Sequence, residues 1–430
     1  MEVEPAIATE TAAVAAQSAQ SPAAGTLTEA DRRSRLAILT TAHMMTHMRG
    51  AVLPLIYPLL MPVMGFGFVQ LGAMLSFTRV VGGLMQGIWG TVARRIPAQR
   101  LIAGEQVGVA MGIGLAAASH SYGELTAAVT FGQVAQSPHH PLASAMLSRW
   151  FGKERGHALA VHFSGANIAT VLSPLLATFL IARWGWRDAL YVFSLPCLAC
   201  AVLVLFRLPV ERGLGAAAAT AATPGGRRRG ALADTLAPLH DPMVRRLVYT
   251  ASITAGGKGM GVVQTLIPLL LVDGLHLGTA MTGLLFTCFT ATSVAGPYLA
   301  GRMSDRFPRA RFLSGMLAVS AVAAAGVMAL LHGPLWALAA VLVCFGLVVY
   351  GCSPVEQAIL GDLTEGSLSE QAYSAFYAIT FATSAIWPLA LTAVLARWGF
   401  EATFAVIGLT YIAGTILYGR GDWSAPEARA

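Results

Sequence analysis

The sequence has little charge for its length. Only 11% of its 430 residues are Asp, Glu, Lys or Arg, whereas 56% are hydrophobic and the mean hydropathy is +0.64. Because soluble domains carry about 25% charged residues, this composition excludes a soluble globular protein and indicates a chain that is solvated by lipid. The net charge of +7 does not indicate nucleic-acid binding, because the cations lie in short loops between apolar runs.

Cysteine is also scarce, and all five cysteines fall inside apolar runs. Cys197 and Cys200 are three residues apart, but no second ligand pair and no βαβ pattern accompanies them, so neither a metal site nor a redox motif is indicated. The sequence has no nucleophile elbow and no glycine-rich nucleotide loop in a soluble context. We therefore expect no enzyme activity, no cofactor and no ATP-driven pumping by this chain alone.

Long apolar runs are abundant. A membrane-spanning helix needs about 20 such residues, and twelve runs meet this need. They cover residues 36–60, 69–92, 100–118, 125–148, 157–182, 189–208, 247–270, 279–301, 311–331, 335–359, 372–396 and 402–419. We expect a disordered cytoplasmic tail (1–35), a first bundle of six helices (36–208), a cytoplasmic linker (209–246), a second bundle (247–419) and a cytoplasmic tail (420–430).

The two predicted bundles repeat one another at a nearly constant offset, which indicates a duplicated unit. The loop that begins at Gly90 and contains Arg94 returns at Gly301, with Asp305 in the place of Arg94. Further matched pairs are Gly72 with Gly283, Pro174 with Pro388, and Trp184 with Trp398.

Two six-helix halves, each with a cationic loop after its second helix, resemble the major facilitator superfamily of secondary transporters. The loop motif of that family, a glycine, an acid and then arginines, is present at Gly301, Asp305, Arg306 and Arg309. In the first half Arg94 stands where the motif has its acid. The resemblance implies an all-α membrane protein with pseudo-twofold symmetry, which works by alternating access of its halves.

The positions of the cations predict the orientation of the chain. If the N-terminus is cytoplasmic, only Arg183, Arg187 and Arg397 of the 28 cations fall in outside loops. Both termini are therefore predicted to be cytoplasmic, in a protein of the inner membrane.

Three cations, Arg49, Arg79 and Lys258, fall inside the membrane near mid-depth. A charge at this depth is costly unless it faces protein or a watery cavity, and transporters built from repeats bind substrate there. We predict that the three cations hold a small organic anion; the alternative is that they only tie helices together. His139, His140 and Asn167 are expected to join the site. Two histidine pairs on different helices do not establish a metal site, so none is predicted.

Proton coupling needs a group that titrates near physiological pH, a role for which histidine and buried carboxyl groups are suited. We predict that His43, His47 and Glu356 include this group. For Glu356 the alternative is an acid that only reaches the cytoplasmic vestibule, because it lies close to the inner end of its helix.

The family resemblance also implies a cytoplasmic latch, in which each loop motif faces the start of a helix in the other half. Asp305 is then expected to face the cationic segment 153–157, and Arg94 the acidic segment 362–370. The predicted latch residues are Arg94, Glu370, Asp305, Arg306 and Arg155. The alternative is that these charges have drifted independently and are only solvated.

Two subgroup resemblances compete. The segments 56–59 and 140–144 look like the fosmidomycin-resistance group of efflux carriers, with His47 where that group has an acid. The segments 148–151, 154–156, 164–167 and 185–187 are similar to carriers of organic anions, of the monocarboxylate and anion:cation symporter type. We expect a proton-coupled carrier of a small organic anion. The alternatives are proton-driven efflux of a drug-like compound and a sensor or assembly factor that does not transport.

Overall fold

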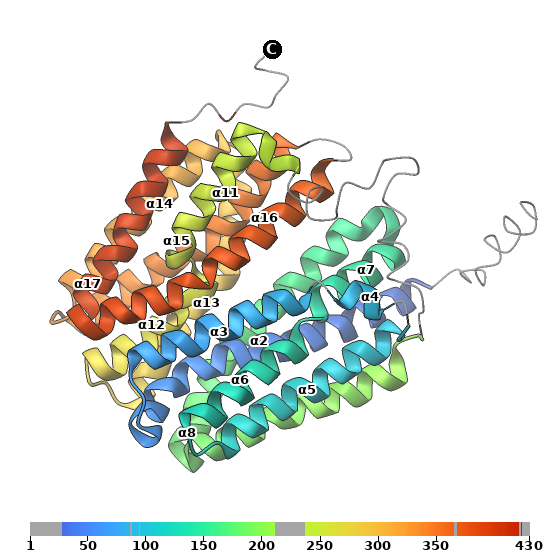
Figure 1. The fold of residues 1–430 in the computed structure, drawn as a ribbon, viewed down its shortest axis with the longest axis horizontal. Coiled ribbons are helices and arrows are strands. Elements are labelled where there is room, and N and C mark those ends of the chain that lie inside the picture. The colour runs from blue at the N-terminus through green and yellow to red at the C-terminus, as the bar shows by residue number, and fades with distance from the viewer. Residues whose placement is uncertain are drawn as a thin grey trace, which may run out of the picture.

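The computed structural model describes residues 28–86, 88–93, 95–210, 237–364, 368–420 and 423, which are helical almost throughout and contain no strand. The first half consists of α2 (Glu29–Met64), α3 (Phe68–Gln86), α4 (Trp89–Val92), α5 (Ala98–Ala118), α6 (Tyr122–Gln136), α7 (His139–Phe151), η1 (Gly152–Glu154) and α8 (Arg155–Arg207). Figure 1 shows it as the blue-to-green bundle, beside the yellow-to-red bundle of the second half.

The second half begins with a broken span. It consists of η2 (Ala237–His240), α11 (Pro242–Thr254), η3 (Ala255–Gly257), η4 (Gly259–Val263), α12 (Gln264–Leu269), η5 (Leu270–Gly274), α13 (Thr279–Ser304), α14 (Arg309–Ala329), α15 (Leu335–Leu363), α16 (Leu368–Ser384) and α17 (Ile386–Gly419). At the break, Gly256 and Gly257 allow close packing, because a Cβ on either residue would clash with Trp387 or Tyr411. Lys258 is the extended residue at the break.

The described helices provide twelve candidate membrane spans, which correspond to the twelve apolar runs. Eight helical stretches are long and apolar enough to span a bilayer. Two of them, His157–Arg207 and Ala375–Gly419, reverse at Gly185 (φ 85°) and Gly399 (φ 80°), so each holds two spans. Glycine adopts positive φ at little cost, and these two glycines are repeat-related. The more polar α2 and the pair α6 and α7 supply the other two spans.

Two predicted boundaries are wrong. Helix α2 begins at Glu29 and not at residue 36, because Thr28 and Asp31 form a capping box that starts the helix in the polar segment. The predicted linker is also too long, since η2 (Ala237–His240) and residues 242–246 of α11 lie inside 209–246. Residues 1–27 and 211–236, which hold the rest of the predicted tail and linker, lie outside the described residues.

The bundles meet through two repeat-related contacts at the ends predicted to be outside. Gly72 of α3 lies against Thr392 of α17, and Gly283 of α13 lies against Thr178 of α8. A Cβ atom on Gly72 or Gly283 would lie 1.8 or 1.7 Å from the threonine Oγ1. Each threonine donates a hydrogen bond to the carbonyl of a proline four residues before it. The pseudo-twofold symmetry thus extends to individual side chains.

Candidate functional site

A cavity of about 270 Å³ lies between the two bundles. Its lining includes Thr46, His47, Arg49, Tyr57, Thr78, Arg79, Gln133, Gln136 and Thr170 from the first half and Gly261, Gln264, Thr265 and Phe381 from the second. No Asp or Glu is among the described residues that line it. The volume is near the lower limit for ligand pockets, which suits a small solute.

Arg49 reaches this cavity from α2, and its side chain is almost fully buried. Its Nη2 donates to Oε1 of Gln133 at 2.7 Å, its Nε donates to Oε1 of Gln136 at 3.2 Å, and its Nη1 lies 3.5 Å from the carbonyl oxygen of Val129. These acceptors are uncharged and belong to α6, so they orient the guanidinium without neutralising it. The two glutamines are part of the site that the sequence analysis missed; their spacing of three residues on one helical face was the available signal.

Arg79 reaches the same cavity from α3 and is half-buried. Among the described residues, none forms a hydrogen bond or ion pair with its guanidinium, and Tyr57 of α2 lies near enough to interact with its charge. The donors of Arg79 are therefore open to a ligand in the cavity.

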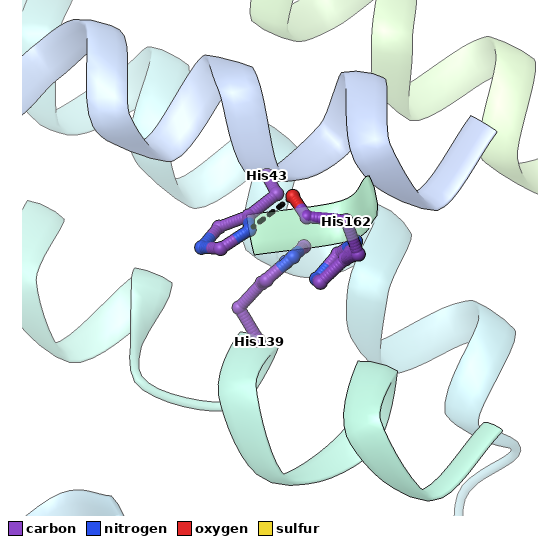
Figure 2. A group of neighbouring side chains, drawn as sticks. All are labelled: His43, His139 and His162. Carbon is purple, nitrogen blue, oxygen red and sulfur yellow. Dashed lines mark hydrogen bonds between the residues drawn. The ribbon is translucent and has the colours of Figure 1, made fainter. Parts of the chain in front are cut away.

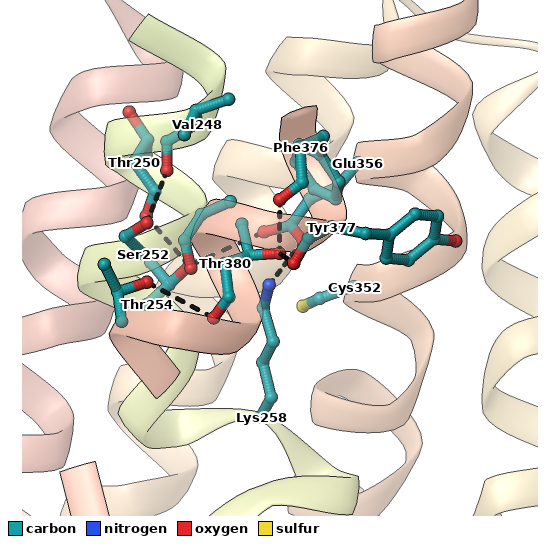
Figure 3. A network of polar contacts seen from close by, with 12 residues as sticks. Val248, Thr250, Ser252, Thr254, Lys258, Cys352, Glu356, Phe376, Tyr377 and Thr380 are labelled. Atoms are coloured by element: carbon teal, nitrogen blue, oxygen red, sulfur yellow. Dashed lines mark hydrogen bonds and ion pairs between the residues drawn. The ribbon is translucent and has the colours of Figure 1, made fainter. Parts of the chain in front are cut away.

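Lys258 points toward Glu356 inside the second bundle (Figure 3) and is not among the residues that line the cavity. Its Nζ donates to Oε2 of Glu356 at 2.7 Å, and Oε1 of the same carboxylate lies 3.4 to 3.5 Å from the hydroxyls of Tyr418 and Thr254. The Lys258 side chain is 19% exposed and that of Glu356 is 2% exposed. The expectation that three cations share one chamber therefore needs correction, since Lys258 pairs with an acid and does not line the cavity.

Of the four predicted histidines, only His47 lines the cavity. His47 lines the cavity, with Nδ1 3.4 Å from Oγ1 of Thr170, whereas His43 is buried behind it, inside the first bundle. His139 is buried beside Glu105 of α5, and His140 is exposed. Neither His139 nor His140 lines the cavity.

Asn167 was also expected to join the site. It donates from Nδ2 to the carbonyl of Ser293 at 3.2 Å, so it ties α8 to α13 and is not among the residues that line the cavity.

The expected cytoplasmic latch is not formed where it can be observed. Asp305 accepts a hydrogen bond at 3.0 Å from Arg309, one turn further on, and Arg309 also pairs with Asp362 of its own bundle. In this structure Asp305 therefore has a partner within its own motif. The side chains of Lys153 and Arg155 lie outside the described residues, so the expected contact of Asp305 with segment 153–157 stays a prediction. Arg306 is exposed. Arg94 and the side chains of Arg155 and Glu370 lie outside the described residues.

A larger groove of about 670 Å³ is formed by α13, α14 and α15 alone. Its lining is apolar apart from Arg311 near one end. Because it touches only one bundle, it does not lie between the halves.

Comparison with known proteins supports this architecture. A family model for the Major Facilitator Superfamily matches residues 38–257 and 251–426, one match for each half. An uncharacterized MFS-type transporter of Bacillus subtilis (strain 168) is 22% identical over 89% of this chain and 91% of that protein. The chloramphenicol resistance protein of Streptomyces lividans is 31% identical, over 36% of this chain and 37% of that protein. The fosmidomycin resistance protein of Escherichia coli (strain K12) is 25% identical, over 39% and 41%.

Solved transporters share the fold at low sequence identity. A structure of the nucleoside transporter NupG aligns with a TM-score of 0.72 and 10% identity over 90% of this chain and 99% of that one. An inward-facing, unoccupied bacterial homologue of the human lysosomal transporter Spinster aligns with a TM-score of 0.70 and 13% identity, over 91% and 95%. Since the family model covers both halves and the fold agrees, the chain belongs to the Major Facilitator Superfamily, whose members are membrane transporters of small molecules and not enzymes.

Proposed function

We propose that this transporter carries a small organic anion across the inner membrane, and that Arg49 and Arg79 hold the anion in the cavity between the bundles. One observation supports this most strongly: two arginines from different helices face one cavity whose described lining contains no acid. A cationic substrate would meet two like charges there, whereas an anion would supply the missing countercharge.

The chemistry of the two arginines suits carboxylates and phosphonates. A guanidinium can bind such a group through two parallel hydrogen bonds, with more directional character than an ammonium group offers. Gln133 and Gln136 already hold Arg49 in one orientation. Arg79 has no such partner among the described residues, so it is the more adaptable of the two contacts.

Protons are the proposed coupling ion. His47 lines the cavity beside the two arginines, and a neutral histidine that gains a proton would strengthen anion binding at that position. Glu356 is the second candidate. Protonation of its carboxyl would release Lys258, which stands only three residues before the cavity-lining Gly261, so that Lys258 would contribute charge to the site in one state only.

Efflux of a drug-like compound is the second candidate function. It is favoured by the partial similarity to the chloramphenicol and fosmidomycin resistance proteins. The two candidates differ in what they would move, because an anion carrier should discriminate against uncharged compounds.

The test is transport by the purified full-length protein in proteoliposomes under an imposed pH gradient. We expect saturable movement of small carboxylates or phosphonates, loss of this movement in Arg79→Ala, and retention in the control Arg183→Ala, whose side chain is exposed near the reversal of α8 at Gly185. Movement of only neutral or cationic compounds, or full anion transport by Arg79→Ala, would refute the anion proposal. No movement of any solute would favour a sensor or assembly factor.

The topology belongs to the same proposal. Vesicles of known orientation, labelled at single cysteines placed in the tails, should react only from the cytoplasmic side if both termini lie there.

A further inference from the structure

Three histidines from three different helices meet inside the first bundle (Figure 2). His43 comes from α2, His139 from α7 and His162 from α8, and each side chain is at most 1% exposed. One ring nitrogen of each lies within 4.8 Å of the others. None of the three lines the cavity between the bundles, so this group is separate from the proposed anion site.

The hydrogen bonds around the cluster leave ligand atoms bare. Nδ1 of His43 lies 3.3 Å from the carbonyl oxygen of His162, which can only accept, so this nitrogen carries the proton and Nε2 carries a lone pair. Nδ1 of His139 lies 2.9 Å from the carboxyl of Glu105. The other ring nitrogen of His139, Nε2, lies on the side of the ring away from this contact and has no hydrogen-bond partner among the described residues.

These nitrogens have no partner within the described protein. Nε2 of His43, Nε2 of His139 and both ring nitrogens of His162 are buried without a hydrogen bond to a described residue. Buried polar atoms are nearly always satisfied, so four unsatisfied imidazole nitrogens in one place indicate a ligand that these side chains can bind.

We propose that His43, His139 and His162 bind one divalent ion of a late transition metal, of the Zn²⁺ class. Imidazole nitrogen is a preferred ligand of these ions, and three histidines with a fourth position left to water or another side chain form a common zinc set. Glu105 would act as a positioning residue, because a carboxylate on the far nitrogen of a ligating histidine fixes its tautomer and orientation.

Binding requires a local rearrangement that the side chains can supply. The three rings are now stacked, with interplanar angles of 9° to 22° and centroids 4.4 to 5.4 Å apart. Coordination at about 2.1 Å requires ring nitrogens that point to one centre, so the rings must rotate about their side-chain torsions. The cluster lies next to the cavity, since the ring centroid of the cavity-lining His47 is 4.6 Å from that of His43.

The ion would cross-link helices of the first bundle. Its ligands come from α2, α7 and α8, and Glu105 adds α5 through His139. It would therefore stabilise the fold of one half. Metal binding can be measured without a transport assay. A negative result for metal binding would therefore not count against the proposed anion transport.

The test uses the purified full-length protein without an affinity tag, stripped with a chelator and titrated with Zn²⁺ or Co²⁺. We expect one ion per chain, a rise in Tm on Zn²⁺ addition, and the visible absorption of four-coordinate Co²⁺. His162→Ala should abolish all three signals, and Glu105→Gln should weaken affinity by about 10- to 100-fold. The control His332→Ala removes an exposed histidine elsewhere and should change none of them.

Two results would overturn the proposal. Equal metal binding by the wild type and His162→Ala would show that the metal binds elsewhere. Absence of metal binding above the chelator background would show that the three histidines bind water or a proton in place of a metal. If His162→Ala does not fold, Glu105→Gln, which preserves the shape of the carboxyl group, still decides: unchanged affinity and an unchanged Co²⁺ spectrum would refute the assignment.

Discussion

The close contact between Gly72 and Thr392 predicts that substitution of Gly72 changes the equilibrium between the transport states of the protein. In Gly72→Ala, the new Cβ would lie 1.8 Å from Oγ1 of Thr392, 2.7 Å from the carbonyl oxygen of Pro388 and 2.9 Å from Cα of Leu389. Two of these three atoms are backbone atoms of the other bundle, so a change of rotamer cannot relieve the clash. The two bundles must move apart at this end.

The size of the effect follows from the cost of overpacking, which is about 1–3 kcal/mol for an added methyl group in a packed site. Only the state in which the bundles touch at this end carries that cost. The equilibrium should therefore shift away from it by about 5- to 150-fold. Gly283→Ala should act in the same direction, because its Cβ would lie 1.7 Å from Oγ1 of Thr178.

The assay is the distance distribution between two spin labels, one placed close to Gly72 on α3 and one close to Thr392 on α17. We expect a longer distance to gain population in Gly72→Ala, and partial reversal when Thr392→Ala is added, since the contact with Pro388 remains. Gly83→Ala is the matched control, because it lies on the same helix with no atom within 4 Å of the new Cβ. Identical distributions for Gly72→Ala and Gly83→Ala would refute the reasoning.

Two further predictions concern the ion pairs. Lys258→Met leaves the carboxyl of Glu356 buried without its cation, so the free energy of unfolding in detergent should fall by about 3–5 kcal/mol. Adding Glu356→Leu should recover most of that loss. A double variant as unstable as the single one would contradict the pairing. Arg94→Glu should slow transport in proteoliposomes if the latch forms during the cycle, and adding Glu370→Arg should restore it, whereas failure of the rescue would argue against this latch.

The fold could be read from the sequence because the relevant signals are local. Run length and hydropathy predict which segments span the bilayer. The pairing of Gly72 with Gly283 predicted only the repeat, and the structure adds that the bundles touch at both positions. The same local reasoning placed Arg49 and Arg79 at one depth, and the structure brings them to one cavity. Depth along a helix follows from its rise alone.

Lateral neighbours could not be predicted in this way. Helix rise places Glu356 nearer the cytoplasmic end of the membrane than Lys258, yet Nζ of the long lysine side chain lies 2.7 Å from Oε2 of Glu356. The histidine cluster depends on which faces of α2, α7 and α8 meet, and one sequence does not specify those faces. Asp305 was assigned to the other bundle although Arg309, one turn away, was the nearer cation.

The repeat conserves the contacts between the bundles but not the charges. Seven residues after Gly72 the first half has Arg79, and seven residues after Gly283 the second half has Thr290 at the corresponding position. Arg79 faces the cavity, whereas Thr290 is buried and donates to the carbonyl of Thr287 within its own helix. If the anion proposal holds, ligand charge is held by the first bundle, while both bundles form the moving contact. Substitution of Arg79 should then raise KM, whereas Gly283→Ala, at a residue that does not line the cavity, should change kcat.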